Sequence, residues 1–395
     1  MRGQLITAPR IVPALPGTGV DGPGYLLVSG GRIAQAGAAP PPASLASSSA
    51  TDPAPERIDL PDGLLVPGFV DLQVNGYYGV EFQDSDQAGW ASVAARLPET
   101  GTTAFLPTCI TAPLPRLAGA LRSAAEIVAG IERGARVLGV HVEGPFLAER
   151  FRGAHNPAWL TAPSPAAVDE LLAAGAGVLR LFTLAPELDG ALAAVAQLAG
   201  AGVLVSVGHS DATAEQVSAA ADAGARMVTH LFNAQRPLHH REPGVTGQAL
   251  ADGRLTSGLI GDLVHVSAQA CRIAFAAAPG RICLVTDAAA CAGMPPGRYL
   301  LGGEPVELPA GDRAAPVRPG GVLAGSALRM DRAVANMTAA GVDLAAAVAA
   351  ATRVPADLIG RPDLGRLAPG AAADVVWLGD DLLTRGTWVG GERVC

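Results

Sequence analysis

Polar residues able to bind a metal ion or move a proton follow short apolar runs at several points along the chain. They stand at the carboxyl ends of five runs and are Gln73 and Asn75, Glu143, His209, His230, and Asp287. If the runs are parallel strands of a (β/α) barrel, their carboxyl ends form one rim, where catalytic groups converge. The side chains would then share one mouth although they are scattered over the sequence.

Each of these residues taken alone also has a structural explanation. Asp287 could cap a following helix, since aspartate is favoured at that position. Glu143 precedes Gly144-Pro145 and could be a turn residue, and a single histidine at a strand end is commonly a hydrogen-bonded structural residue. Capping does not explain a glutamate, two histidines and an aspartate at four different strand ends, so the combination points to function.

The combined set has a coherent chemistry. Two imidazoles and one carboxylate leave an open position on a zinc-like ion, which is the arrangement of a catalytic site. Such an ion polarises a carbonyl group and lowers the pKa of its bound water toward neutrality. Asp287, if it is not a tight ligand, could take the proton of that water and pass it to a leaving amine. The pattern favours hydrolysis of a C–N bond over redox chemistry.

The middle of the chain has the alternation expected of a barrel that would position these groups. Short apolar runs alternate with alanine-rich stretches, which is typical of a parallel sheet with crossover helices. Thr213 and Gln216 fit a capping box, Gly224 stands where that helix should stop, and Ser164-Pro165 resembles an N-cap followed by proline. The eight expected strands are 69–74, 104–108, 137–142, 179–184, 204–207, 227–231, 256–260 and 282–286.

Both ends of the chain are rich in β-strand signals. Residues 25–28 and 32–34 flank Gly30-Gly31, and 373–378 and 387–389 precede Gly390-Gly391, while 36–56 reads as a flexible surface loop of Ala, Pro and Ser. We therefore predict an α/β protein: a (β/α)8 TIM-like barrel over 67–365, with a small β-sandwich domain formed by both chain termini, 1–66 and 366–395.

Composition limits the partners of the protein. Of its 395 residues 49% are hydrophobic and 4% aromatic, and the formal net charge is −8, so neither nucleic acid nor an anionic membrane is an expected partner. A phosphorylated substrate would have to be bound by a few placed groups.

The five cysteines are odd in number and form no CxxC pair, and no signal peptide or membrane span follows Met1. These features predict a cytoplasmic protein with reduced thiols.

Several motifs, in the right order, resemble those of the N-acetylglucosamine-6-phosphate deacetylases of the amidohydrolase superfamily. The resemblance runs from Gly30 to Leu378. Its motifs are PGFVDLQVNG (67–76), TGTTAFLPT (100–108), GVHVEGPFL (139–147), GAHNP (153–157), VGHSDAT (207–213), THLFNA (229–234), REPG (241–244), VTDA (285–288) and LAGS (323–326).

The resemblance implies roles for the residues at the strand ends. Glu143, His209 and His230 match the metal ligands, and Asp287 matches the catalytic acid and base. His265 matches a histidine that contacts the substrate and polarises the amide carbonyl. The implied reaction converts N-acetylglucosamine-6-phosphate to glucosamine-6-phosphate and acetate.

Further residues match the substrate contacts of that family. His155 matches a substrate-contacting histidine, and Asn233 and Ala234 match backbone contacts to the sugar phosphate. Arg241 matches a phosphate-binding arginine that related enzymes can take from the neighbouring subunit. The resemblance therefore implies a homodimer or a dimer-based oligomer whose site depends on both subunits.

The first strand departs from the superfamily pattern. Most members carry an HxH pair there for a second metal, whereas this chain has Gln73-Val74-Asn75. Neutral amides are weak zinc ligands compared with imidazole, so Gln73 and Asn75 are expected to be a remnant of a second-metal site. We expect one divalent metal ion per subunit, with zinc as the default and iron or another divalent metal as the alternative.

Some assignments stay open in the sequence. His141 is interpreted as structural, Gly325-Ser326 as support for the site, and His239 and His240 as either phosphate contacts or a solvated loop. The substrate could instead be N-acetylgalactosamine-6-phosphate or the amide of another superfamily member. A non-catalytic barrel scaffold is disfavoured because the ligands and the acid are all present.

Overall fold

A barrel of parallel strands forms the body of the protein in this computed structural model, which describes residues 3–19, 22–45, 54–311 and 314–395. Its strands pair in chain order, and the last returns to the first through a bridge between Val74 and Ala288 and a 2.9 Å bond from the Asp287 N–H to the Gln73 carbonyl. The eight predicted strands are therefore confirmed as one nearly closed barrel. They are β6 (Phe69–Val74), β9 (Thr102–Ile110), β11 (Val140–Glu143), β12 (Leu179–Leu184), β13 (Leu204–Val207), β14 (Met227–Val228), β15 (Thr256–Ile260) and β16 (Ile282–Val285).

Two predicted strands differ in detail from the structure. The run 137–142 is divided into β10 (Arg136–Val137) and β11, because the chain breaks at Gly139, whose φ of 136° few other residues adopt. The run 227–231 is a strand only at Met227–Val228, because the backbone turns at His230 with a φ of 25°. The break at Gly139 lies four residues before Glu143, and the turn is at His230 itself, so both irregularities are close to predicted metal ligands.

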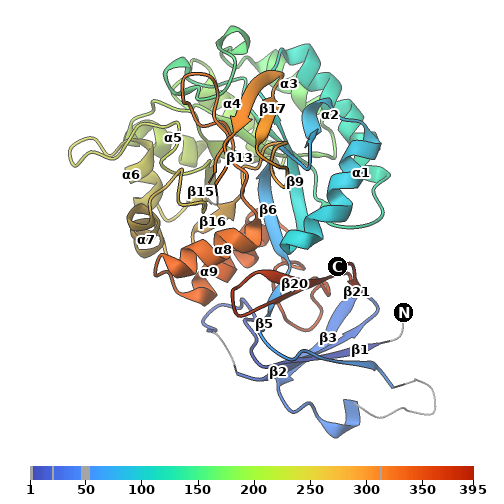
Figure 1. Cartoon of the computed structure of the whole chain (residues 1–395). Coiled ribbons are helices and arrows are strands. Elements are labelled where there is room, and N and C mark those ends of the chain that lie inside the picture. The colour runs from blue at the N-terminus through green and yellow to red at the C-terminus, as the bar shows by residue number, and fades with distance from the viewer. Residues whose placement is uncertain (1–2, 20–21, 46–53, 312–313) are drawn as a thin grey trace.

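Helices cover the outside of the barrel (Figure 1). The predicted capping box of Thr213 with Gln216, the helix end at Gly224 and the N-cap at Ser164 are all present. Alanines on the buried helix faces, such as Ala194 and Ala220, let the helices approach the sheet closely. The helices are α1 (Gln87–Arg96), α2 (Leu114–Ala129), α3 (Pro165–Ala174), α4 (Ala191–Gly200), α5 (Ala214–Ala223), α6 (Gly244–Ala251), α7 (Ala268–Ala277), α8 (Met330–Ala339), α9 (Leu344–Ala351) and α10 (Arg353–Leu358).

The two ends of the chain form a small β domain below the barrel (Figure 1). Its two four-stranded sheets share an apolar core that includes Ile6, Leu26 and Trp388. This matches the predicted β-sandwich of both termini, whose boundaries at 66/67 and 365/366 stay a prediction. In sheet order the strands are β3 (Arg32–Ala38), β2 (Gly24–Ser29), β1 (Gln4–Ala8) and β4 (Glu56–Asp59), then β21 (Glu392–Arg393), β20 (Thr384–Val389), β19 (Val375–Leu378) and β5 (Leu64–Pro67).

The predicted loop over 36–56 is shorter than expected. Strand β3 extends to Ala38, a single 3-10 turn spans Ala43–Leu45, and β4 begins at Glu56. Residues 46–53 of that loop lie outside the described residues. Within the described chain, no helix has both the length and the apolar character needed to cross a membrane.

The second sheet of the small domain has two buried faces. Leu65 and Val375 point into the core of the small domain, whereas Leu64, Val66 and Val376 pack into the barrel core. This division follows from the alternation of side chains along a strand. The sheet is therefore a shared layer between the two parts of the protein.

A hairpin after the last barrel strand, β17 (Gly297–Leu301) with β18 (Glu304–Leu308), was not predicted. Leu301, Val306 and Leu308 of the hairpin form a separate apolar cluster with Ile110 and Cys291. Leu301 also lines the cavity at the barrel mouth. The hairpin thus covers part of the rim on which the predicted site residues stand.

A buried ion pair between the two parts allows a test of the shared layer. The Asp374 side chain is 2% exposed and accepts 2.7 Å bonds from Arg136 Nη2 of the barrel and from the Gly390 N–H. We predict that Asp374→Ala lowers the free energy of unfolding by roughly 2–3 kcal/mol, because it removes hydrogen bonds to a buried charge. The measurement is urea denaturation.

The matched control is Asp380→Ala, which removes an exposed ion pair with Arg10. Exposed pairs contribute little, so its midpoint should equal that of the unmodified protein within error. Equal midpoints for all three proteins would contradict the stabilising role of Asp374.

Candidate active site

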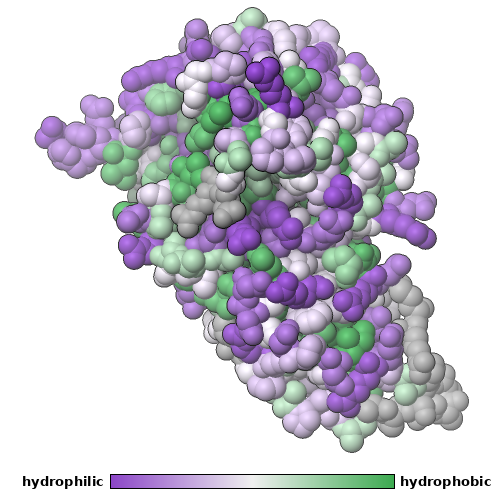
Figure 2. Space-filling view, in the orientation of Figure 1, coloured by the Kyte–Doolittle hydropathy of each residue, from purple (hydrophilic) through white to green (hydrophobic). Residues whose placement is uncertain are grey.

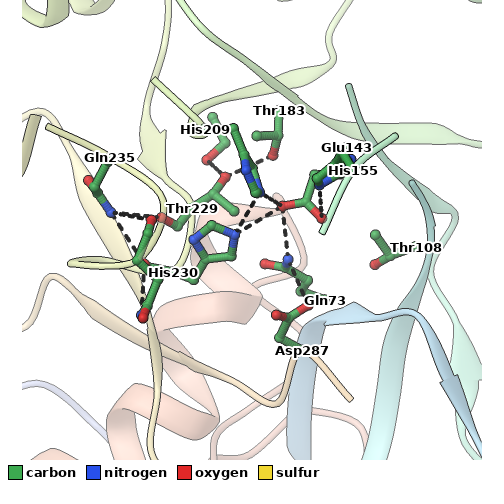
Figure 3. A network of polar contacts seen from close by, with 12 residues as sticks. Gln73, Thr108, Glu143, His155, Thr183, His209, Thr229, His230, Gln235 and Asp287 are labelled. Carbon is green, nitrogen blue, oxygen red and sulfur yellow. Dashed lines mark hydrogen bonds and ion pairs between the residues drawn. The ribbon is translucent and has the colours of Figure 1, made fainter. Parts of the chain in front are cut away.

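One buried carboxylate, that of Glu143 at the end of β11, lies at the centre of the site (Figure 3). Its Oε1 lies 3.2 Å from the Nε2 atoms of His209 and His230 and 3.2 Å from Nε2 of Gln73. The two histidine Nε2 atoms are 3.1 Å apart. The structure therefore brings together the three predicted metal ligands.

The backbone is strained where it delivers these side chains. His209, His230 and Asp287 have φ values of 48°, 25° and 51°, in the left-handed region that side chains other than glycine rarely adopt. Each is the second residue after the end of a barrel strand, β13, β14 or β16, and lies in the turn that follows it. The side chains of all three are therefore delivered at the carboxyl end of the barrel. Strain of this kind concentrates at functional sites, where the surrounding structure enforces it.

The three donors fit a metal ion. Ligands of a tetrahedral ion at about 2.1 Å lie roughly 3.4 Å from one another, close to the separations of the Glu143, His209 and His230 atoms. The His209 Nδ1–H donates to the Phe151 carbonyl at 2.9 Å, which leaves Nε2 with a free lone pair in the neutral ring. Burial alone would raise the pKa of Glu143, but its hydrogen bonds with the two imidazoles outweigh burial and hold that pKa well below its usual value.

His155 supplies a fourth donor at the same place. Its Nε2 lies 3.8 Å from Glu143 Oε2, and its Nδ1 lies 2.7 Å from the Thr111 hydroxyl. Glu143, His155 and His209 offer ligand atoms within 4.8 Å of one another, so this trio could also hold a metal ion. Burial and the neighbouring His209 lower the pKa of His155 to about 3, so its ring is neutral.

Asp287 faces this group from the opposite side, between two amides. Its Oδ1 accepts hydrogen bonds from Gln73 Nε2 at 3.0 Å and Asn75 Nδ2 at 2.7 Å. Burial, followed by the charge of Glu143, raises the pKa of Asp287 to about 6. A carboxyl group with that pKa can exchange a proton near neutral pH.

A cavity of about 360 Å³ opens above these groups. The predicted substrate residues His155, Asn233, Ala234 and His265 line it, together with Glu143, His209, His230, Asn75 and Asp287. Arg150, Leu301 and Leu323 also line it, and none of the three was predicted from the sequence. The cavity therefore combines the donor set with an apolar wall and one arginine.

Arg241 does not line the cavity of its own chain. It is exposed, with His239 and His240, on the loop between β14 and α6 that extends from the body at the left of Figure 1. Figure 2 shows this extension as hydrophilic. The predicted phosphate contact of Arg241 is therefore not formed at the cavity of its own chain.

The remaining predictions concern supporting residues. His141 lies buried below the site, with Nε2 2.8 Å from the Thr183 hydroxyl, which agrees with its structural interpretation. The Ser326 carbonyl accepts a hydrogen bond from the Ala289 N–H, and the Ser326 N–H donates to the Asp287 carbonyl at 2.7 Å. Gly325-Ser326 therefore supports the turn that carries Asp287.

Sequence reasoning missed the carboxylates that brace the site. Asp211 accepts hydrogen bonds from Arg150 at 2.9 Å and Arg236 at 2.8 Å, and so joins three loops of the rim. Asp262 pairs with His265 at 2.6 Å. The available signal was an aspartate two residues after His209 and another three residues before His265, but only the folded loops reveal the partners of these aspartates.

Comparison with known proteins agrees with this geometry. The model of the amidohydrolase family matches residues 64–394. The chain belongs to the amidohydrolase family. A relative from Danio rerio named N-acetylglucosamine-6-phosphate deacetylase is 38% identical over 353 residues, 86% of this chain and 87% of the relative. A relative from Escherichia coli O157:H7 named N-acetylgalactosamine-6-phosphate deacetylase is 39% identical over 347 residues, 87% of this chain and 91% of the relative.

Solved structures of this family have the same fold. A mutant N-acetyl-D-glucosamine-6-phosphate deacetylase from Mycobacterium smegmatis, in complex with N-acetyl-D-glucosamine-6-phosphate, superposes with a TM-score of 0.90 at 35% identity over the whole of both chains. The enzyme from Pasteurella multocida gives 0.87 at 29% identity over 99% of each chain. The resemblance noted in the sequence is confirmed.

The donor set predicts how metal content responds to substitution. His209→Ala should reduce the bound metal well below one ion per subunit, because it removes an imidazole from the centre of the set. Elemental analysis after purification measures this. His239→Ala, which removes an exposed histidine, should leave the metal content unchanged, and equal metal in both variants would exclude His209 as a ligand.

Proposed function

We propose that this protein is a metal-dependent deacetylase that converts N-acetylglucosamine-6-phosphate to glucosamine-6-phosphate and acetate. The observation that carries the proposal is the convergence of Glu143, His209 and His230 opposite Asp287 in one cavity. Membership of the amidohydrolase family, with deacetylases as relatives, supports the same reaction. Free cysteines at all five positions are consistent with a cytoplasmic enzyme.

Glu143, His209 and His230 are proposed to hold one divalent ion, with zinc as the default and iron as the alternative. When bound, the ion polarises the acetyl carbonyl and acidifies a water molecule. The amides of Gln73 and Asn75 donate to Asp287, so they serve as neutral supports where other members carry a second metal. A single ion is the expected stoichiometry.

Asp287 is proposed to be the proton carrier. As a carboxylate it accepts a proton from the attacking water, and it then donates this proton to the nitrogen of the departing amine. Its pKa of about 6, raised by burial and by Glu143, suits both steps. His265, across the cavity, donates a hydrogen bond to the carbonyl oxygen as negative charge develops there.

The sugar phosphate is proposed to lie against His155 and the backbone of Asn233 and Ala234. Arg241 would come from the neighbouring subunit of a homodimer, because it is exposed and does not line the cavity of its own chain. An arginine from the partner suits a protein whose net charge of −8 otherwise repels phosphate.

A second substrate is supported by one specific observation. The relative named N-acetylgalactosamine-6-phosphate deacetylase is as similar to this chain as the N-acetylglucosamine-6-phosphate deacetylases are, at 39% against 38%. The two sugars differ only in the configuration at C4. We therefore propose N-acetylgalactosamine-6-phosphate as the alternative substrate of the same chemistry.

The deciding experiment is acetate release by protein of known metal content. The substrates are N-acetylglucosamine-6-phosphate, N-acetylgalactosamine-6-phosphate and unphosphorylated N-acetylglucosamine. Turnover of the first that is lost on chelation supports the proposal, and faster turnover of the second reassigns the sugar. Absence of turnover by metal-loaded protein would favour another amide substrate or a scaffold.

We predict that Asp287→Asn abolishes turnover while the metal stays bound, because an amide cannot carry the proton. Loss of kcat should reach about 10³-fold or more. The control is Asp380→Asn on the surface, which should retain full activity. Substantial turnover by the Asp287 variant would refute its role.

Arg241→Ala should raise KM for the phosphorylated sugar by about tenfold or more with a smaller effect on kcat, because one charged hydrogen-bond donor to the phosphate is lost. Arg254→Ala, which removes an arginine ion-paired with Asp222 and Asp252, is the control. Mixing R241A with D287N subunits should restore a site of normal KM in heterodimers. No recovery on mixing would place Arg241 outside the neighbouring site.

A further inference from the structure

The loop after β15 contains a carboxylate with an unusually complete set of partners. Asp262 Oδ1 accepts the N–H groups of Val264 at 2.8 Å and His265 at 2.9 Å. Asp262 Oδ2 lies 2.6 Å from His265 Nδ1. The backbone bonds fix the carboxylate in the loop, and the third bond fixes the imidazole.

The other face of His265 is turned to the cavity. Its side chain is 5% exposed and lines the cavity together with Asp287. Within the described ranges of the chain, no atom hydrogen-bonds its Nε2. Since Asp262 occupies Nδ1, Nε2 is the ring atom left for a ligand.

The charge of Asp262 decides what Nε2 can do. A neutral imidazole whose proton is on Nδ1 has a lone pair on Nε2, so it can only accept a hydrogen bond there. A carbonyl or phosphate oxygen also only accepts. His265 can donate to such an oxygen and to Asp262 at once only when both ring nitrogens are protonated.

Asp262 has the properties needed to stabilise that doubly protonated ring. Partial burial pushes the pKa of Asp262 upward, but the hydrogen bonds from His265 and from the loop backbone outweigh it, so its pKa lies below the usual value. The carboxylate is therefore ionised. An anion in contact with Nδ1 favours the imidazolium, and the resulting pair is neutral as a whole.

We propose that Asp262 is a positioning residue that keeps His265 as an imidazolium whose Nε2–H points at the reacting oxygen of the substrate. The inference rests on the proposed function, since it assigns how His265 of that same site is made a donor. Asp262 does not touch the substrate. It acts through His265. Asp287 is another carboxylate that faces the same cavity as His265, but it does not contact the Nδ1 atom that Asp262 holds.

The alternative is that Asp262 only caps its loop. Asp262→Asn separates the two roles, because the amide oxygen still accepts the N–H groups of Val264 and His265 but carries no charge. We expect D262N to lower kcat by up to about 10²-fold, because the introduced amide can donate to Nδ1 of a neutral ring whose Nε2–H is then a weaker donor to a developing oxyanion; KM should change less than about threefold. Metal content and melting temperature should match those of the unmodified protein.

A double-mutant cycle with His265→Gln tests whether Asp262 acts through His265. We expect D262N to cost activity in the unmodified protein and nothing further in the H265Q background. Losses that multiply would overturn the proposal, as would full activity of D262N. Full activity of H265Q would instead refute the role of His265 in the proposed function.

The control variant is Asp343→Asn. Asp343 caps α9 through the Ala346 N–H, as Asp262 caps its own loop, but no histidine contacts it. D343N should leave kcat unchanged. If D262N does not fold, Asp262→Glu keeps the charge and should retain more activity than Asp262→Ala.

A spectroscopic measurement tests the charge state without any substrate. In protein labelled with ¹⁵N at its seven histidines, both ring nitrogens of His265 should report attached protons at pH 7, assigned by their loss in H265Q. In D262N the ring should be neutral at that pH. A neutral His265 in the unmodified protein would overturn the proposal whether or not the enzyme accepts the sugars named above.

Discussion

The site depends on one constraint. The Glu143 carboxylate is buried at the barrel mouth, so hydrogen-bond donors must replace the water that would otherwise stabilise its charge. An isolated carboxylate in an apolar interior is too costly to persist. Here the imidazoles of His209 and His230 and the amide of Gln73 surround one oxygen at 3.2 Å. The ends of β6, β11, β13 and β14 therefore meet at Oε1 of Glu143. The positions of these strand ends on the rim are set by the need to hydrogen-bond this buried oxygen.

Bringing these side chains to one buried carboxylate requires backbone conformations that are unfavourable for residues other than glycine. The left-handed φ values of His209, His230 and Asp287 would be avoided in free loops. Secondary contacts oppose the strain: the Phe151 carbonyl accepts from His209, and Ser326 bonds the backbone of Asp287. The rigid barrel beneath, with every residue of β6 and β9 buried, gives these contacts a fixed base.

Features of the fold and site that arise from local sequence patterns could be predicted from the sequence, whereas those that arise from contacts between distant segments could not. The barrel strands and the capping box at Thr213 follow from local patterns, and the convergence of Glu143, His209, His230 and Asp287 follows from the rule that strand ends share a rim. The break at Gly139 and the turn at His230 are set by tertiary contacts, so the predicted strands were too long there. The hairpin with Leu301 and the pairing of Asp262 with His265 depend on where loops fold in space, which no periodicity encodes.

The sheet that contains β5 and β19, which is buried on both faces, has a consequence for folding during translation. Strands β1 to β4 are synthesised first, yet the sheet that covers their apolar face includes β19, β20 and β21 from the last part of the chain. During translation the barrel can fold progressively, but Ile6 and Leu26 lack Val375 and Trp388 until the ribosome has nearly finished. The last strands therefore complete the first domain, and a chain that stops before β19 leaves an apolar surface at both its oldest strands and the base of its barrel.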